Sequence, residues 1–521
     1  MCGILAVFGK PIALAKNLAK LKNRGPEETT MMEKDRIQLG FTRLAINGLT
    51  NGSQPFQDNF GITWMCNGEI YNHKELSTLL NFKPTTGSDC EVIGEVYKTY
   101  IDPFSMFDGV FAIVIVNEGV ATIARDPCGV RPLYMSVGPE RVIFASELKA
   151  IPYDSTALVS AFPPGHYLKL NIQTLSCKFT RYTSKVTTPQ VVEADRAFFG
   201  VMDHLMMSVN KRMMMERPMA ALLSGGLDSS VIAALLQKNM KISLKTFSIG
   251  FKGSEDLRCA KLVADHIMSD HTEIIMTPKQ FFDAIPQVIR DIESFDITTV
   301  RASVGNWLVA REIAKTDCKV VFNGDGADEL LGGYMYFHKS PSNEAFIEER
   351  DRLLADIHHF DVLRSDRCIS SHGLEPRTPY LDKDLVRYVR RIAPELLRPT
   401  PTQQEKFILR TAFDGTDLLP AEILWRKKEA FSDGVSSVGG LSWYQECQLR
   451  AEQLHPNWKR EAANITYLQP KTAEAYYYRK LFMEYYGDVN VNVPYYWMPK
   501  WSPETSDPSA RTLNPPATNS S

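Results

Sequence analysis

The sequence has 521 residues, of which 44% are hydrophobic and 23% are charged. This balance is typical of a globular protein and excludes a disordered or fibrous one. The formal net charge of −2 gives no electrostatic reason to expect a nucleic-acid partner, since such binding requires a basic surface. No stretch reaches the roughly 18 uncharged apolar residues of a membrane helix. Because a chain of this length exceeds one ordinary core, we expect two or three domains.

The nine cysteines are scattered along the chain without a CxxC pair. This pattern predicts free thiols in a reducing compartment, so we expect a cytoplasmic protein with no membrane partner. Cys2 directly follows Met1 in the opening MCGILAVFG. It has three interpretations: a buried structural thiol, the start of a targeting peptide, or a nucleophile that becomes N-terminal when Met1 is removed. A signal peptide has basic residues before its apolar region, whereas here Lys10 comes after it.

The first part of the chain carries short apolar segments separated by Gly, Asn, Asp and Pro, a pattern that predicts strands. We expect them at 2–9, 37–46, 61–68, 110–117, 120–126, 141–147 and 166–172. Helical spacing predicts helices at 73–82 and 90–101. The mixture indicates stacked antiparallel sheets with helices packed outside them, an α+β arrangement. A polar stretch at 183–195 reads as a linker.

The second part of the chain alternates between strand and helix patterns. A helix is predicted at 194–215, followed by strands at 219–223, 244–251, 271–276 and 319–324, with helices at 230–240 and 257–267 between them. This alternation predicts an α/β domain with a parallel sheet. Later segments are helical and aromatic-rich, up to 474–487. The tail 501–521 has too few apolar residues to order most of itself.

The most specific short motif is LLSGGLDSS, residues 222–230, between a predicted strand and a predicted helix. A glycine-rich turn at a helix N-terminus presents free N–H groups and the positive end of the helix dipole, which suits a phosphate. It is not a Walker loop, because no GK[ST] follows. The alternative is a tight strand-to-helix turn that happens to carry serines. The context favours phosphate binding.

A second loop, NGDGADEL, follows the strand predicted at 319–324. Its carboxylates, Asp325 and Asp328, should therefore lie at the carboxyl edge of the sheet, where open α/β folds bind ligands. A solvated acidic turn is the alternative. Carboxylates and phosphates are the usual ligands of Mg²⁺, so together with Asp228 of the first loop this loop predicts a shared Mg²⁺ site.

Three family resemblances run along the chain. MCGIL, NRGPE, FTRLAI, CNGEIYN, GSDCE, FDGVFA, ARDPCGVRPLY and FASELKA occur in that order and resemble the class II glutamine amidotransferase domain, an N-terminal-nucleophile (Ntn) hydrolase. SGGLDSS is similar to the pyrophosphate loop of the N-type ATP pyrophosphatases. With FDITTVRAS, HGLEPRTPYLD, WRKKEAFSDG, YWMPKW and DPSARTL, the whole chain resembles the glutamine-dependent asparagine synthetases.

The resemblance implies a fold and domain boundaries. It implies an Ntn-hydrolase αββα sandwich at 1–185 and a parallel-sheet domain like the adenine-nucleotide α-hydrolases at 195–500, followed by a C-terminal tail at 501–521. It also implies ATP as a substrate, Mg²⁺ as a cofactor, and aspartate and glutamine as small-molecule substrates. The sequence does not determine the oligomeric state, and a homodimer is one of the possibilities.

In the first domain the resemblance implies a glutaminase site. Removal of Met1 would leave Cys2 with a free α-amine, of pKa about 8, that can take the thiol proton. The thiolate would attack the side-chain amide of glutamine, with Asn67 and Gly68 as the oxyanion hole. Arg43 can pair with the α-carboxylate of glutamine, and Asp89 with Glu69 can accept from its α-amine. The implied glutamine-binding residues are Arg43, Leu44, Ala45, Ile46, Asn47, Asn67, Gly68, Glu69 and Asp89.

In the second domain the resemblance implies that the β-carboxylate of aspartate attacks the α-phosphorus of ATP. This step gives β-aspartyl-AMP and pyrophosphate, and ammonia then yields asparagine and AMP. Lys428 matches the lysine that stabilises the charge of the phosphoryl-transfer transition state. Asp228 and Asp328 are the implied metal ligands, and Asp325 matches a catalytic position. The implied ATP-binding residues are Leu223, Ser224, Gly225, Gly226, Asp228, Ser229, Ile249, Asn323 and Gly324.

The chain departs from the family pattern in two motifs. The usual HRGPD is NRGPE here, with Asn23 and Glu27, and the usual SGEGSDE is NGDGADE, with Asn323 and Asp325. Asp325 keeps the negative charge of the family's Glu but is one methylene shorter, an offset that can weaken catalysis.

Two other functions remain as alternatives. One is an enzyme with the same two domains that cyclises or amidates another carboxylate, like a β-lactam synthetase. The presence of Cys2, Asn67 and Asp89 argues against it, because such relatives need no ammonia. The other is a degenerate paralogue that acts as a regulator, for which the substitutions at Asn323 and Asp325 are the only support.

Overall fold

The computed structural model describes the chain except for residues 184–189, 430–433, 438, 489–492, 503–506 and 510–521. The chain falls into two units. Unit 1 consists of Met1–Lys185, Met214–Pro218 and Ile369–Pro376, and unit 2 of Val186–Met213, Met219–Cys368 and Arg377–Ser521. Much of the predicted linker at 183–195 and most of the predicted tail at 501–521 lie outside the described residues.

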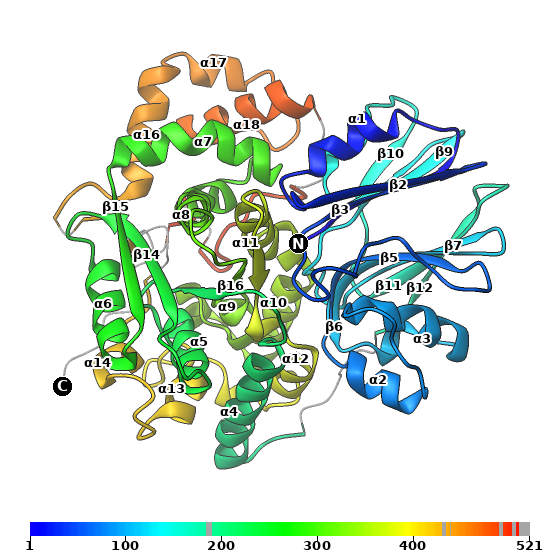
Figure 1. The fold of residues 1–521 in the computed structure, drawn as a ribbon. Coiled ribbons are helices and arrows are strands. Elements are labelled where there is room, and N and C mark those ends of the chain that lie inside the picture. The colour runs from blue at the N-terminus through cyan, green and yellow to red at the C-terminus, as the bar shows by residue number, and fades with distance from the viewer. Residues whose placement is uncertain (184–189, 430–433, 438, 489–492, 503–506, 510–521) are drawn as a thin grey trace. The chain divides into compact units, whose positions relative to one another are not determined.

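Unit 1 contains two six-stranded antiparallel sheets (Figure 1). The first has the order β10-β8-β9-β1-β3-β2 and the second β12-β11-β7-β6-β5-β4. The strands of the first sheet are β1 (Gly3–Gly9), β2 (Glu28–Lys34), β3 (Ile37–Arg43), β8 (Tyr134–Val137), β9 (Arg141–Ala145) and β10 (Leu158–Ala161). Those of the second are β4 (Phe56–Gln57), β5 (Thr63–Ile70), β6 (Gly109–Asn117), β7 (Val120–Arg125), β11 (His166–Asn171) and β12 (Cys177–Arg181).

Helices cover the outer faces of these two sheets. Figure 1 shows α1 (Leu14–Leu18) beside the first sheet, and α2 (His73–Leu79) and α3 (Ile93–Thr99) beside the second. Short 3-10 turns lie at Ala19–Leu21, Asp89–Val92, Phe104–Met106 and Leu148–Ala150. One buried apolar cluster joins the inner faces of both sheets and includes Ile4, Phe41, Met65, Val114 and Phe144. This is the expected αββα Ntn-hydrolase sandwich.

All seven strands predicted in unit 1 are present. The structure also contains strands that the sequence did not predict, namely β2, β4, β8, β10 and β12. β2 reads ETTMMEK and alternates between half-buried and exposed residues, so it lacks the apolar run that predicted the others. It pairs only with β3 at the edge of its sheet, where one face meets solvent.

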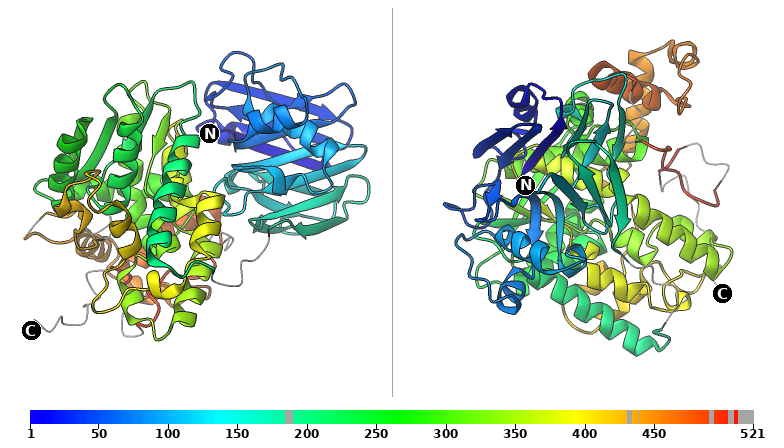
Figure 2. Two further views of the ribbon diagram at one scale, coloured as in Figure 1. Left: turned by 90° about the horizontal axis from the view of Figure 1, so that it is seen from below. Right: turned by 90° about the vertical axis from the view of Figure 1, so that its right-hand side faces the viewer.

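The third sheet has five strands in the order β15-β14-β13-β16-β17, and its first four strands belong to unit 2. The pairs among β13, β14, β15 and β16 are parallel, as the alternating pattern predicted. The strands are β13 (Met219–Leu222), β14 (Lys245–Phe251), β15 (Asp270–Met276), β16 (Val320–Phe322) and β17 (Glu375–Arg377). Helices lie on both faces of this sheet (Figures 1 and 2).

The helices of unit 2 include those predicted at 194–215, 230–240 and 257–267, which are α4, α5 and α6. The α-helices are α4 (Ala194–Lys211), α5 (Leu227–Lys238), α6 (Glu255–Ile267), α7 (Pro278–Ile292), α8 (Ile297–Ile313), α9 (Ala327–Leu331), α10 (Asn343–Asp356), α11 (Asp361–Ser370), α12 (Lys383–Val389), α13 (Phe407–Phe413), α14 (Ala421–Leu424), α16 (Trp443–Leu454), α17 (Trp458–Ala462) and α18 (Ala473–Tyr486). Four 3-10 turns lie at Met335–Lys339, Ile357–His359, Pro379–Leu381 and Pro394–Leu396.

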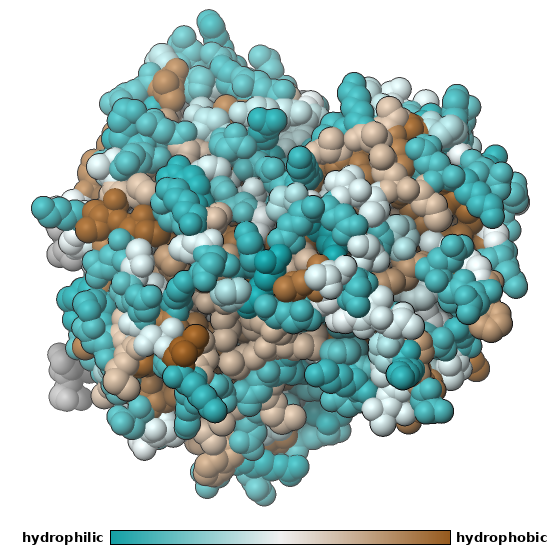
Figure 3. Space-filling view, viewed as in Figure 1, coloured by the Kyte–Doolittle hydropathy of each residue, from teal (hydrophilic) through white to brown (hydrophobic). Residues whose placement is uncertain are grey.

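The outer surface mixes polar and apolar side chains. On the face drawn in Figure 3, apolar residues are scattered among hydrophilic ones. Within the described residues, no helix is both long enough and apolar enough to span a membrane.

Candidate active sites

The first candidate site lies where β1 begins. The backbone N–H of Cys2 donates to Asn67 Oδ1 at 3.0 Å, and Cys2 Sγ lies 3.8 Å from the carbonyl oxygen of Leu44. Asn67 belongs to β5 and is fully buried. Its Nδ2 is buried and has no hydrogen-bond partner among the described residues. A buried amide donor without a partner is costly unless a ligand oxygen accepts from it. The structure therefore places a free donor next to the predicted nucleophile.

The ionisation of this site depends on Met1. With Met1 in place, burial raises the pKa of the Cys2 thiol, and burial also lowers the pKa of the Met1 α-amine. That amine lies 3.5 Å from Glu375 Oε2, in a fully buried position. A buried thiol with a raised pKa is a poor nucleophile, because the thiolate is the reactive form. Activation of Cys2 thus requires a base within reach.

The predicted glutamine-binding loop, residues 43–47, is held by contacts inside unit 1. Arg43 is buried and donates from Nη2 to the carbonyl oxygen of Gly48 at 2.5 Å, and Arg43 Nη1 lies 3.4 Å from Glu28 Oε2. Asn47 Nδ2 donates to Glu69 Oε2 at 2.8 Å. Arg43 and Glu69 therefore already have partners in the loop, and their predicted contacts with glutamine remain predictions.

The remaining predicted residues of this site lie around the same loop. Asp89 accepts from the Ile70 N–H at 2.6 Å, and burial raises the pKa of its carboxyl group. Gly68 packs so closely that a Cβ there would lie 2.1 Å from the carbonyl oxygen of Val110, so only glycine fits. The predicted residues Leu44, Ala45 and Ile46 are all buried.

The departure at Glu27 has a structural explanation. Glu27 Oε2 accepts from the Ala45 N–H at 2.7 Å, and Oε1 pairs with Arg217 Nη2 at 2.6 Å. Arg217 also donates to the carbonyl oxygen of Ala45, and Glu216 Oε1 accepts from the Gly48 N–H. The segment Met214–Pro218 thus braces the loop. Sequence reasoning missed this brace, because no motif marks it.

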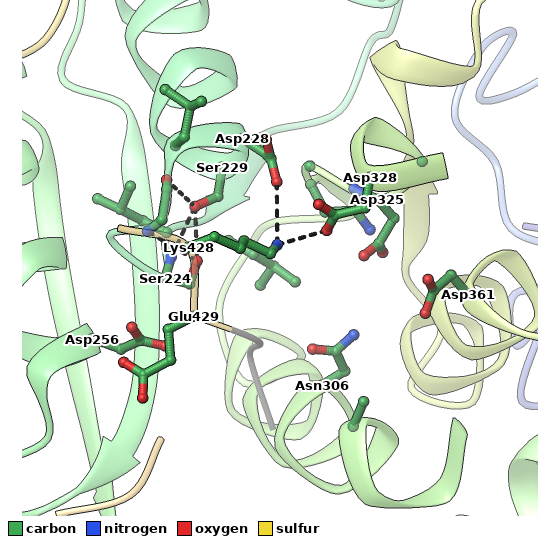
Figure 4. A pocket seen from close by; sticks show the side chains of 18 of the residues that line it. Ser224, Asp228, Ser229, Asp256, Asn306, Asp325, Asp328, Asp361, Lys428 and Glu429 are labelled. Atoms are coloured by element: carbon green, nitrogen blue, oxygen red, sulfur yellow. Dashed lines mark hydrogen bonds and ion pairs between the residues drawn. The ribbon is translucent and has the colours of Figure 1, made fainter. Parts of the chain in front are cut away.

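The second candidate site is a pocket in unit 2. It is lined by the two loops that the sequence singled out, together with α8, α11 and residues 426–429 (Figure 4). Both loops follow strands of the parallel sheet, β13 and β16, so the pocket lies at the carboxyl edge of the sheet, as predicted. Of the predicted ATP-binding residues, Leu223, Ser224, Gly226, Asp228, Ser229, Ile249, Asn323 and Gly324 line it.

Gly225 is the one predicted ATP-binding residue that does not line the pocket. It has φ +73°, and a Cβ there would lie 2.4 Å from the backbone nitrogen of Ala260. Glycine is required for this turn, which leads into α5 with Gly226 as its N-cap. Within the loop, the hydroxyl oxygens of Ser224 and Ser229 lie 3.0 Å apart, and the Ser224 N–H donates to Ser229 Oγ at 3.1 Å.

Two carboxylates and two lysines meet in the pocket. Lys428 Nζ lies 2.6 Å from Asp328 Oδ2 and 3.9 Å from Asp228 Oδ2, as Figure 4 shows. Lys406 Nζ lies 2.5 Å from Asp228 Oδ2 and 2.5 Å from Asp328 Oδ1. Sequence reasoning predicted Asp228, Asp328 and Lys428 but missed Lys406, which precedes α13 in a segment without glycine-rich or acidic signals. Its buried side chain is 1% exposed.

The charged groups in this pocket shift the pKa values of Asp328 and Lys428. Burial alone would raise the pKa of Asp328, but the Lys406 and Lys428 ammonium groups hold that pKa below its ordinary value. Burial alone would lower the pKa of Lys428, but Asp328 and Asp228 raise it above its ordinary value. Both shifts favour the charged forms of Asp328 and Lys428.

The carboxylates fit a magnesium ion that arrives with phosphates. Asp228 Oδ1 is buried and accepts no hydrogen bond from any described residue, so it is an available oxygen ligand. No group of three or more His, Cys, Asp and Glu side chains among the described residues is arranged to hold a metal. Mg²⁺ typically takes one or two carboxylates and completes its shell with substrate phosphates and water, which is the donor set that Asp228 and Asp328 offer.

Asp325 lies at the far side of the same pocket. Its Oδ1 accepts from Arg364 Nη2 at 2.8 Å, and Arg364 Nη2 also lies 2.9 Å from Asp361 Oδ1. Burial raises the pKa of Asp325. The other departure, Asn323, donates from Nδ2 to Ser365 Oγ at 2.6 Å and accepts from the Asp325 N–H. Asn323 and Asp325 thus both contact side chains of α11.

A further acidic pair stands beside Asp325. The Tyr334 hydroxyl lies 2.6 Å from Glu329 Oε1 and 2.7 Å from Asp361 Oδ2. Burial, followed by the charge of Asp361, raises the pKa of Glu329 well above its usual range, whereas Arg364 holds the pKa of Asp361 below its ordinary value. Sequence reasoning did not single out Arg364, Asp361 or Tyr334, since each is an isolated residue in a helical or aromatic stretch.

Comparison with known proteins matches the two parts of the chain to two different domains. Residues 1–198 match the model of a glutamine amidotransferase domain, and residues 200–353 and 342–510 match that of asparagine synthase. The chain is 39% identical over 555 aligned positions to the glutamine-hydrolysing asparagine synthetases of Gallus gallus, Pongo abelii and Homo sapiens, with 98% of each chain covered.

These matches define a class and then a family. The class is that of enzymes that join a glutamine amidotransferase domain to a nucleotide-using domain. The chain belongs to the glutamine-hydrolysing asparagine synthetase family. Among solved structures, the glutamine phosphoribosylpyrophosphate amidotransferase of B. subtilis is 16% identical with a TM-score of 0.33, and the match covers 53% of this chain and 91% of that one. That likeness adds nothing to the fold described above.

Proposed function

We propose that this protein makes asparagine from aspartate, with ATP and with ammonia released from glutamine. The intermediate is β-aspartyl-AMP, and the other products are AMP, pyrophosphate and glutamate. The observation that carries the proposal is the pocket in which a strand-to-helix phosphate loop, two carboxylates and Lys428 converge. We assign glutamine hydrolysis to residues 1–185 and synthesis to residues 195–500, with 501–521 as a tail.

The glutaminase half uses Cys2. Removal of Met1 converts the backbone nitrogen of Cys2 into a free α-amine, which accepts the thiol proton. The thiolate attacks the side-chain carbonyl carbon of glutamine, and the negative charge that develops on the carbonyl oxygen faces Asn67 Nδ2 and the Gly68 N–H. The C–N bond breaks, ammonia leaves with a proton from the amine, and water hydrolyses the thioester to glutamate. The unpartnered Asn67 Nδ2 supports this role.

The residues around Cys2 bind and orient glutamine in this proposal. The Arg43 guanidinium faces the α-carboxylate, and the carboxylates of Asp89 and Glu69 face the α-ammonium group. One wall of this pocket is formed by Leu44, Ala45, Ile46 and Asn47. The hydrogen bond from the Ala45 N–H to Glu27 helps to hold this wall in place. Because all of these glutamine-facing groups except Asn47 are buried, and Asn47 donates to Glu69, the pocket is pre-organised for its ligand.

The synthetase half activates aspartate. One oxygen of the β-carboxylate attacks the α-phosphorus of ATP, the bond between the α-phosphorus and the bridging oxygen breaks, and pyrophosphate leaves. The N–H groups of the 224–229 loop face the leaving pyrophosphate, and Lys428 neutralises charge in the transition state. Asp228 and Asp328 would hold Mg²⁺, which when bound supplies positive charge to the phosphate oxygens.

The second step consumes ammonia. Its nitrogen attacks the β-carbonyl carbon of the intermediate, the C–O bond to AMP breaks, and the excess proton passes to a carboxylate of the pocket. Asp325 is the proposed group, oriented by Arg364. The chemistry of the pocket supplies cations for the phosphates and a carboxylate for the proton, which is what the two half-reactions require.

The test is a product assay with matched cysteine variants. The purified protein, given glutamine, aspartate, ATP and Mg²⁺, should form asparagine, AMP, pyrophosphate and glutamate in equal amounts. The Cys2→Ala variant should lose the glutamine-driven reaction, while Cys177→Ala, which changes an exposed cysteine on β12, should not. Formation of ADP in place of AMP would refute the proposed chemistry.

A further inference from the structure

The pocket of unit 2 holds a charge-balanced cluster at the place where a metal is expected. Asp228 and Asp328 contribute two negative charges, and Lys406 and Lys428 contribute two positive charges within 2.5–3.9 Å. Lys406 is the central member, because its single ammonium group lies 2.5 Å from an oxygen of each carboxylate. The four groups neutralise one another, with Lys406 buried and the other three side chains partly exposed.

Lys406 is fixed in this position by its surroundings. It is the N-cap residue of α13 and has a left-handed backbone conformation with φ 56°, which is uncommon for a residue with a side chain. A Cβ at Gly333 would lie 2.0 Å from Lys406 Cε and 2.2 Å from Asp328 Oδ1. The lysine stem therefore packs tightly against Gly333, and its ammonium group is directed at the carboxylates.

Charge balance sets the order in which ligands can enter. A divalent cation that enters alone adds two positive charges to a neutral, partly buried cluster. To bind both carboxylates through two oxygens each, it must compete with Lys406 for Asp228 Oδ2 and Asp328 Oδ1, which is unfavourable where water is partly excluded. A divalent cation that enters with the four negative charges of ATP brings anions that can accept from the displaced lysines. The cluster therefore favours the metal–nucleotide complex over the free metal.

We propose that Lys406, assisted by Lys428, occupies three of the four carboxylate oxygens as a placeholder for the metal, so that a divalent cation binds this pocket only together with ATP. The proposal rests on the proposed ATP site. It assigns Lys406 a binding role in that site, and it predicts that Lys406 suppresses binding of free metal.

The experiment measures metal binding without catalysis. Mn²⁺ substitutes for Mg²⁺ and is counted by electron paramagnetic resonance of the free ion, in the full-length protein, with and without an α,β-non-hydrolysable ATP analogue. The unmodified protein should bind Mn²⁺ at least about tenfold more tightly with the analogue than without it, given the size of one partly screened charge interaction. Lys406→Met should bind Mn²⁺ alone about tenfold or more tightly than the unmodified protein does.

A matched control separates this effect from a general change in charge. Lys427→Met removes the same charge from an exposed lysine that lines the pocket, and it should leave the Mn²⁺ affinity nearly unchanged because solvent screens it. Tight nucleotide-independent Mn²⁺ binding by the unmodified protein overturns the proposal, as does an unchanged affinity in Lys406→Met. If Lys406→Met does not fold, Lys428→Met must show the same gain in Mn²⁺ affinity, or the proposal fails.

Failure of the ATP site itself gives a different result. Binding of the analogue is measured separately by equilibrium dialysis in the presence of Mg²⁺. If the analogue does not bind at all, the proposed function is wrong. If it binds and Mn²⁺ binds equally well without it, only the placeholder role is wrong.

Discussion

Lengthening Asp325 to glutamate tests how the synthetase site tolerates its shorter carboxylate. Asp325→Glu moves the carboxylate forward by about 1.5 Å, one carbon–carbon bond. In the structure the carboxylate is held by Arg364, 2.8 Å away, and Arg364 is also bound to Asp361. A longer side chain must therefore push against a guanidinium that is already anchored, or point past it toward the substrate.

The magnitude follows from these contacts. A charge-assisted hydrogen bond contributes about 1.5–3 kcal/mol. A glutamate that loses its hydrogen bond with Arg364 therefore loses about that much of the free energy that holds the carboxylate in one orientation. A misplacement of about 1 Å can change a rate on the order of a hundredfold. We expect Asp325→Glu to change kcat for asparagine by about ten- to a hundredfold, with ATP binding nearly unchanged, since Asp325 touches neither lysine.

The assay couples pyrophosphate release and asparagine formation, with glutaminase activity measured in parallel. Glutaminase should be unaffected, because Cys2 lies in unit 1 and Asp325 in unit 2. Asp325→Ala is the companion variant. If it retains the full synthetase rate, this carboxylate has no part in the chemistry and the reasoning is refuted.

Four further outcomes are expected. Cys2→Ala should abolish glutamine-driven synthesis but retain synthesis from ammonium salts, and loss of both would show that the two sites are not separable. Asp228→Asn and Lys428→Ala should each lower pyrophosphate formation by about a hundredfold or more with glutaminase retained, whereas loss of glutaminase in both would indicate unfolding. Burial raises the pKa of Asp256 to about 6, so acidification through pH 6 should weaken the ion pair between Asp256 and Arg426. Because Arg426 also donates to the Gly225 carbonyl oxygen of the phosphate loop, the same acidification should raise the KM for ATP. The free energy of unfolding depends on pH in the opposite direction: the stability that Asp256 contributes through its raised pKa is full below the unfolded pKa of about 4 and is lost as pH rises through 6. A KM for ATP that is constant from about pH 5 to 7 would contradict the role of the ion pair. Asp507→Asn should lower the free energy of unfolding by about 1–3 kcal/mol, because Asp507 and Glu474 share the buried guanidinium of Arg301, and unchanged denaturant unfolding would exclude that contribution.

The sequence predicted the fold where apolar patterning or glycine chemistry was strong. The alternation of strands and helices after residue 219 and the turn at Gly225 required a parallel sheet with a loop at its carboxyl edge, and both are present. β2 was missed because an edge strand half exposed to solvent needs no apolar run. The sequence thus carries the signal of buried elements better than that of edge strands.

The candidate sites divide in the same way. Residues inside contiguous motifs, such as Asn67 and Asp228, could be singled out before the structure was known. Lys406 and Arg364 could not, because each reaches its site from a distant segment and carries no local pattern. Their importance comes from tertiary contacts with Asp228, Asp328 and Asp325, which only the fold creates.

The most direct test of the central claim follows an oxygen atom. Aspartate labelled with ¹⁸O in its β-carboxylate is converted in the presence of ATP, Mg²⁺ and glutamine, and the products are analysed by mass spectrometry. Attack of the carboxylate on the α-phosphorus, followed by displacement by ammonia at carbon, transfers one labelled oxygen to AMP. One ¹⁸O is expected in each AMP and none in pyrophosphate. Unlabelled AMP, or label in pyrophosphate or inorganic phosphate, would contradict it.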